Sequence, residues 1–132
     1  MDEKILLKYQ RRIDDFLTSV SDNLVYRDYI PLTVEAAVTP EVVPYKDRLS
    51  LDYHPVHERE TWGYDWASAW FHVTAEVPEE FAGKELCLRF HVGGEALVFN
   101  DGGVPVYGLT GYSVFDELYC KERMVIGSDM TK

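Results

Sequence analysis

The chain has 132 residues, a net charge of −10, 46% hydrophobic residues and 27% charged residues. This length suffices for one domain with one core, and the composition is ordinary for a soluble globular protein. The negative charge opposes contact with nucleic-acid phosphates and anionic membranes, so neither is an expected partner. No apolar run approaches the roughly 18 residues that a membrane helix needs, and the acidic N-terminus is unlike a secretory signal. We therefore expect a cytoplasmic protein.

Residues 2–21 are expected to form an amphipathic helix, within a first segment that spans residues 1–25. Apolar side chains recur every three or four positions on one face, and charged side chains fall largely on the other. The apolar positions are Ile5, Leu6, Tyr9, Ile13, Phe16, Leu17 and Val20. Asp2 is a suitable N-cap, and acidic residues near the start suit the helix dipole. The apolar face is wide, so we expect the helix to dock on another surface.

Residues 26–61 are expected to form a Pro-rich connector that wraps a surface. Four prolines interrupt regular structure, because each fixes φ and removes a backbone donor. They are Pro31, Pro40, Pro44 and Pro55. Short extended pieces are expected at Leu32–Ala37 and Leu49–Tyr53. The content of Val, Leu and Tyr is too high for a freely solvated linker.

Residues 62–132 are expected to form an antiparallel β-sandwich. Apolar and polar residues alternate in Phe71–Val77 and in Leu86–Val92, which is the pattern of strands with one buried face. Further short strands, separated by turns, are expected at Ala96–Asn100, Val104–Leu109 and Glu122–Ile126. The glycines after Asn100 predict a tight hairpin. These strands are fewer than the eight of a jelly roll, so either the sandwich is incomplete or strands are hidden in residues 26–60.

The histidines do not predict a metal site. His54 and His57 have an H-x-x-H spacing in a Pro-containing loop, without the third and fourth ligands that a zinc site needs. His72 and His91 are expected on neighbouring strands, where they can face each other across the sheet. Adjacent acidic pairs on the helix and in a turn do not create a catalytic cleft. We therefore expect neither catalytic residues nor metal ligands in this chain.

The chain has two cysteines, Cys87 and Cys120. A disulfide framework in a small secreted domain would need more of them. Free thiols in a reducing compartment are the expected state, and a single bridge between the two is the open alternative.

Five aromatic residues lie within ten positions between Trp62 and Phe71. Aromatic faces match the apolar face of a pyranose ring, and an indole N–H can donate to a hydroxyl group. The candidate carbohydrate-binding residues are Trp62, Tyr64, Asp65, Trp66 and, from the hairpin, Asn100. The alternative, which the pattern favours, is that the rings fill the core or the seam with another domain.

Several segments together resemble the N-terminal helix and β-sandwich of family 38 glycoside hydrolases, the α-mannosidases. The matching segments are Trp62–Val73, Val77–Lys84, Leu86–Phe90, Gly93–Gly102 and Pro105–Leu109. The sandwich domain of family 2 β-glycosidases has a similar spacing of motifs. Two segments, Gly94–Ala96 and Gly108-Leu109, make the resemblance to family 38 stronger than that to family 2. The implied fold is mainly β, an antiparallel jelly-roll-like sandwich of the galactose-binding-domain type, with one amphipathic helix before it.

The resemblance implies a function for the parent protein more than for this chain. Enzymes of the family are retaining exo-mannosidases, whose zinc and carboxylate nucleophile lie in an α/β barrel C-terminal to the sandwich. None of that barrel is present, so zinc is implied for the missing domain and no cofactor for this segment. We expect a non-catalytic accessory domain whose partner is its own catalytic domain.

Two other functions remain open. The chain can be an independent carbohydrate-binding module for mannosides, or a protein-interaction domain that forms a homo-oligomer. If the sandwich is incomplete, an open sheet edge follows near residues 122–126, and open edges pair with other chains. That edge predicts dimerisation or aggregation.

Overall fold

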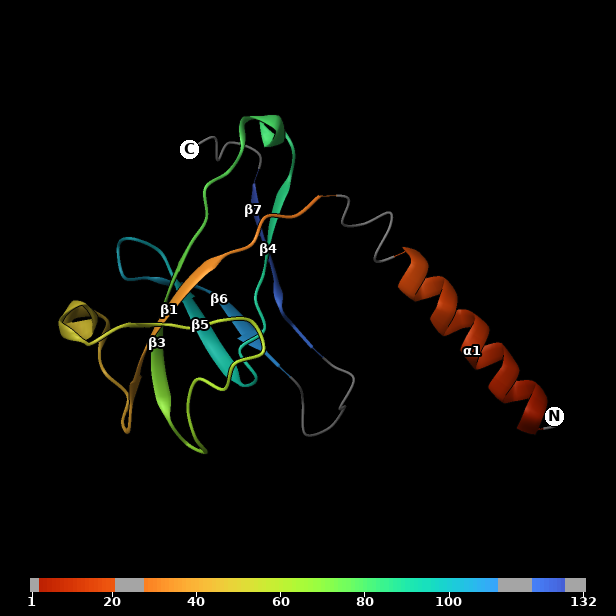
Figure 1. Cartoon of the computed structure of the whole chain (residues 1–132), viewed down its shortest axis with the longest axis horizontal. Helices are drawn as coiled ribbons and strands as arrows, with labels where there is room; N and C mark the ends of the chain where they lie inside the picture. Colours follow the sequence, from red (N-terminus) through yellow and green to blue (C-terminus); the bar gives the residue numbers. More distant parts are fainter. Residues whose placement is uncertain (1–2, 21–27, 112–119, 128–132) are drawn as a thin grey trace. The chain divides into compact units, whose positions relative to one another are not determined.

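The computed structural model describes residues 3–20, 28–111 and 120–127. These residues form two compact units, which meet in the sequence between Pro31 and Leu32. The first unit holds a single helix, and the second holds all of the described strands (Figure 1). The prediction of a mainly β, antiparallel protein preceded by one helix is confirmed.

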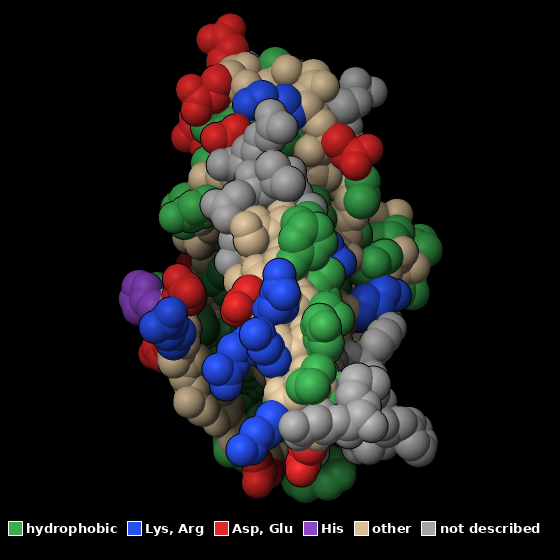
Figure 2. Space-filling model, turned by 90° about the vertical axis from the view of Figure 1, so that its right-hand side faces the viewer, with side chains coloured by type: hydrophobic (Ala, Val, Ile, Leu, Met, Phe, Trp, Pro, Cys, Tyr) green, Lys and Arg blue, Asp and Glu red, His purple; other side chains and the backbone are tan. Residues whose placement is uncertain are grey.

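Helix α1 (Glu3–Val20) accounts for the predicted amphipathic segment. It contains neither Gly nor Pro, and Glu3 places a negative charge in the first turn, where the helix dipole favours it. The expected N-cap, Asp2, lies outside the described residues. No residue of α1 is buried, and its large apolar side chains remain about half exposed, up to 66% at Phe16. The space-filling view likewise shows hydrophobic side chains reaching the surface beside Lys and Arg (Figure 2).

The strands of the second unit form three small antiparallel sheets. The first sheet has the order β2-β1-β3, while β4 pairs with β7 and β5 with β6. The strands are β1 (Thr33–Thr39), β2 (His54–Pro55), β3 (Ser68–Thr74), β4 (Leu86–Arg89), β5 (Glu95–Phe99), β6 (Pro105–Thr110) and β7 (Arg123–Gly127). Short 3₁₀ helices, Tyr45–Ser50 and Glu79–Phe81, each follow a proline in extended conformation.

The segment expected to be a connector supplies the middle strand of the first sheet. Strand β1 coincides with the extended piece predicted at Leu32–Ala37, and it pairs with β3 from Thr33↔Thr74 to Thr39↔Ser68. The piece predicted at Leu49–Tyr53 begins instead inside a 3₁₀ helix. The Pro44 carbonyl accepts the Asp47 N–H at 3.0 Å, which starts that helix.

Strand β1 is covered on both of its faces. Ala36 and Ala37 are 3% and 2% exposed, and successive residues of a strand point to opposite faces. Their register partners in β3 are Phe71 and Trp70, respectively. The small alanine side chains leave room for the two large rings, which also point to opposite faces of the sheet.

Each of these rings belongs to its own aromatic cluster. The Trp70 cluster consists of Trp70, Tyr45 and Phe99, and the Phe71 cluster consists of Phe71, Trp62 and Phe90. Contacting rings within a cluster have centroids 5.1–5.9 Å apart, the range in which aromatic pairs attract. The clusters attach the first sheet to β5 and to the end of β4. Among the described residues, no helix has the length and apolar character to cross a membrane.

Candidate functional site

The three tryptophans of the aromatic segment have different environments. The Trp62 indole donates from Nε1 to the Val92 carbonyl oxygen at 2.8 Å, and the Trp70 indole donates to the Val43 carbonyl oxygen at 2.8 Å. Both side chains are partly buried in their clusters. Their N–H groups are therefore already occupied within the protein.

Trp66 faces solvent. Its exposed fraction is 98%, and it lies in a tight turn in which the Ala67 N–H donates to the Tyr64 carbonyl oxygen at 3.0 Å. Its φ of 69° is in the left-handed region, which a bulky L-residue rarely adopts. Tyr64, at the start of the same turn, is 64% exposed. The turn thus presents two aromatic side chains to solvent.

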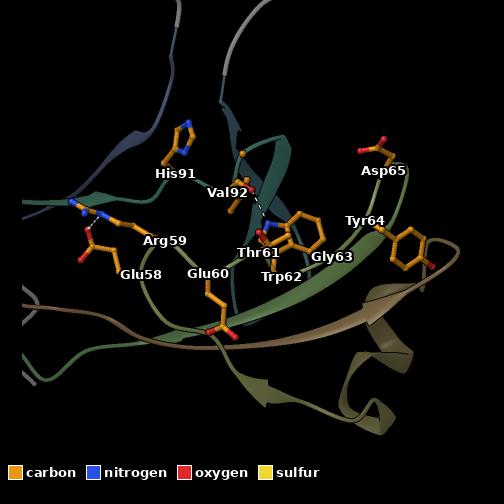
Figure 3. A pocket seen from close by; sticks show the side chains of 11 residues that line it. Glu58, Arg59, Glu60, Thr61, Trp62, Gly63, Tyr64, Asp65, His91 and Val92 are labelled. Carbon is orange, nitrogen blue, oxygen red and sulfur yellow. Dashed lines mark hydrogen bonds and ion pairs between the residues drawn. The ribbon is translucent and has the colours of Figure 1, made fainter.

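A groove of about 580 Å³ runs between this turn and the end of strand β4. Its lining comprises residues 58–65 and 91–93 (Figure 3). Tyr64 and Asp65 lie at one end, His91 lies toward the other, and the Trp62 indole lies between them with its hydrogen bond to Val92 (Figure 3). The groove therefore combines one indole with acidic, basic and hydroxyl groups.

The structure brings some of the predicted carbohydrate-binding residues together. Trp62, Tyr64 and Asp65 line the groove, whereas Trp66 lies on the same turn but is not part of the lining. Asn100 lies outside the lining as well, in the β5–β6 hairpin.

Asn100 has a structural role in that hairpin. Its Oδ1 accepts the N–H groups of Gly102 and Val104, both at 3.0 Å. The Tyr45 hydroxyl lies 3.2 Å from the Asn100 carbonyl oxygen and 3.1 Å from that of Asp101, so it donates to this pair. The amide side chain closes the turn, and the hairpin is attached to the Trp70 cluster through Tyr45.

The expectation that His72 and His91 face each other is wrong. Strand β3 pairs with β1, so His72 lies opposite Glu35, with 3.4 Å between Nδ1 and the Glu35 Oε2. His91 follows β4, which pairs with β7. Among the other histidines, His54 contacts Asp52 at 3.2 Å.

His91 is instead close to two residues that shortly precede β7. His91, Cys120 and Glu122 each place one potential ligand atom within 4.8 Å of the others. Sequence reasoning compared only the spacing of the histidines and did not bring these three residues together. The available signal was the spacing of Cys120 and Glu122, which puts both side chains on one side of an extended segment.

Arg89 forms an ion pair with Glu122, the carboxylate of this group. Its Nε lies 2.5 Å from the Glu122 Oε1, and the Cys120 Sγ donates to the Glu122 Oε2 at 3.4 Å. Desolvation raises the pKa of Glu122, but the hydrogen bonds from Arg89 and Cys120 and the charges of Arg89 and His91 outweigh it and lower the pKa. Desolvation and the hydrogen bond to Glu122 raise the pKa of the Cys120 thiol. Cys87 and Cys120 are both free and exposed.

Comparison with known proteins places residues 30–129 in one family. They match the family model described as the jelly roll domain of α-mannosidase. The chain is 34% identical to mouse (Mus musculus) α-mannosidase 2C1 over 86 residues, covering 65% of this chain and 8% of that protein. It is 38% identical to human (Homo sapiens) α-mannosidase 2C1 over 73 residues, covering 55% and 7%.

A third relative is matched over more of the chain. Identity to α-mannosidase G of Dictyostelium discoideum is 32% over 120 residues, covering 81% of this chain and 11% of that protein. The chain therefore spans 7% to 11% of the length of these curated relatives. No solved structure matches it significantly.

Proposed function

Because this chain belongs to the α-mannosidase jelly roll domain family, we propose that it is the non-catalytic accessory domain of a cytoplasmic α-mannosidase. In this proposal it supports the catalytic barrel, and the catalytic zinc and nucleophile belong to that barrel. The family match over residues 30–129 carries the proposal. It also favours the resemblance to α-mannosidases over that to family 2 β-glycosidases. The free, exposed thiols of Cys87 and Cys120 are consistent with a reducing compartment.

The packing of the aromatic segment is evidence for a structural, non-catalytic role of this domain. Trp62 and Trp70 use both their rings and their N–H groups inside the unit. These contacts stabilise the domain, and they leave neither indole N–H group free to bind a substrate, although the Trp62 ring still lines the groove.

The exposed apolar face of α1 is evidence that another domain binds this helix. Ile5, Ile13, Phe16 and Leu17 are 47% to 66% exposed. Complete burial of one such side chain contributes roughly 1.5–3 kcal/mol, so a surface that covered the rest of this face would bind the helix strongly. We infer that the catalytic domain supplies that surface.

Two measurements test this function. The 132-residue chain alone should not release chromophore from an aryl α-mannoside, whereas the full-length enzyme should. In the full-length enzyme, Phe16→Ser on the apolar face of α1 should lower the calorimetric Tm. Asp15→Ser, at the next position of the helix, is the matched control and should leave the Tm unchanged.

Specific outcomes contradict the proposal. Hydrolysis by the chain alone would refute the non-catalytic role. Equal Tm values for the two serine variants and the unmodified enzyme would refute docking of α1 on the catalytic domain.

A carbohydrate-binding module is the second candidate, and the exposed turn favours it. Trp66 and Tyr64 are 98% and 64% exposed beside the groove. Titration calorimetry with mannosides should then show binding that Trp66→Ala weakens at least tenfold. Tyr29→Ala, which removes an aromatic ring that is 89% exposed elsewhere in the chain, should have no effect. Absence of binding heat with a folded sample would eliminate this candidate.

A further inference from the structure

We propose that His91, Cys120 and Glu122 bind a thiophilic divalent cation such as Zn²⁺ at the rim of the groove. This site would be separate from the zinc that the proposed function assigns to a catalytic barrel, and it lies entirely within this chain. The three groups offer an imidazole nitrogen, a thiol sulfur and a carboxylate oxygen within 4.8 Å of one another. Those are the three donor types that protein zinc sites use.

The backbone holds the two segments of the site together. The Phe90 N–H donates to the Glu122 carbonyl oxygen at 2.8 Å, beside His91. Lys121, between the other two ligands, exchanges two hydrogen bonds of 2.9 Å with Thr110 of strand β6. Cys120 and Glu122 are two positions apart in an extended segment and therefore project to the same side. Each ligand is thus within one residue of a backbone pairing.

The three potential ligand atoms would need to move only slightly closer together to coordinate a cation. Zinc bonds of roughly 2.0–2.3 Å in a tetrahedron place ligand atoms about 3.3–3.8 Å apart. Because all of the potential ligand atoms lie within 4.8 Å of one another, no pair needs to approach by more than about 1.5 Å. His91 and Cys120 are exposed, so their side chains can rotate without disturbing the core.

The hydrogen bonds at Glu122 leave a place for the cation. Arg89 occupies Oε1, and the thiol proton of Cys120 points at Oε2. On binding, that proton leaves for solvent, and sulfur and Oε2 become ligands without any change of oxidation state. Arg89 on the other oxygen acts as a positioning residue that orients the carboxylate.

The site leaves one coordination position open and touches the groove. Three protein ligands leave a fourth position for water or another ligand, as in open zinc sites. His91 also lines the groove that contains Trp62 and Asp65. A cation here would therefore add a coordination point at the groove rim.

Cobalt(II) titration of the reduced, metal-free chain tests the proposal. Unmodified protein should bind one Co²⁺ per chain and show a thiolate-to-cobalt charge-transfer band, which one equivalent of Zn²⁺ abolishes. Cys120→Ser should remove the band, and His91→Gln should weaken binding at least tenfold. The matched controls are Cys87→Ser, which removes the other exposed cysteine, and His72→Gln, which removes the histidine paired with Glu35.

The controls make the result decisive. Both control variants should retain the band and the unmodified stoichiometry, and circular dichroism should show that every variant is folded. Loss of the band in Cys87→Ser, its persistence in Cys120→Ser, or no saturable binding by folded unmodified protein would each overturn the assignment.

Discussion

Replacing Trp66 with glycine is expected to stabilise the chain, although it removes the largest natural side chain. Trp66 is 98% exposed, so loss of the indole removes almost no packing. Its φ of 69° strains any residue that has a Cβ atom. Glycine adopts this conformation without that strain.

The expected magnitude follows from two opposing terms. A left-handed conformation costs an L-residue roughly 1–2 kcal/mol, and glycine removes this cost. Glycine has greater conformational freedom in the unfolded chain, and this lowers the free energy of unfolding by roughly 0.5–1 kcal/mol. The net gain in free energy of unfolding is therefore about 0–1.5 kcal/mol for Trp66→Gly. Trp66→Ala keeps the strain and should lie within about 0.5 kcal/mol of the unmodified chain.

Urea denaturation of the full chain, followed by far-ultraviolet circular dichroism, measures the difference. Trp70→Ala serves as the contrasting variant, because it removes a partly buried ring and leaves the Val43 carbonyl without its donor. It should cost roughly 3–4 kcal/mol, toward the lower end of the range for buried Trp. If Trp66→Gly proved less stable than Trp66→Ala, the exposed turn would not be strained and the reasoning would be refuted.

Three further substitutions test the fold. Gly103→Ala should lower the Tm by several degrees more than Gly83→Ala in thermal melts, because both glycines have positive φ but only at Gly103 would a Cβ lie 2.7 Å from the Tyr45 ring. Asn100→Ala should cost roughly 1–3 kcal/mol in urea, because two backbone N–H groups of the hairpin lose their acceptor. Glu122→Gln in chelator should cost about 0.5–1 kcal/mol near pH 7. The folded-state pKa of this carboxyl is lowered, so its contribution is present above the unfolded pKa and the deficit should vanish as pH falls through the folded pKa.

The sequence predicts those parts of the fold that depend on local periodicity. Alternation in β4 and the helical spacing in α1 indicate elements close to the observed ones, and the glycines after Asn100 indicate the hairpin between β5 and β6. The role of β1 depends instead on pairing across the chain. Its Ala36 lies opposite Phe71, and no local pattern indicates that a Pro-rich segment supplies the middle strand of a sheet.

In the candidate site, too, local sequence patterns do not indicate the features that depend on the folded backbone. Trp62, Trp66 and Trp70 look alike in the sequence, yet only Trp66 faces solvent, on a turn where its backbone has a positive φ. His91 and Glu122 lie together through the pairing of β4 with β7. That pairing joins segments about thirty residues apart, beyond the reach of the local patterns that sequence reasoning uses.

The opposite orientations of Trp70 and Phe71 constrain how this domain can be re-engineered. A one-residue insertion within β3 would exchange the two rings between faces, and both clusters would lose their partners together. The middle of β3 is therefore a poor point for grafting a tag or opening a circular permutant. The turn that carries Trp66 is a better insertion point, because its exposed side chain contributes little to the core.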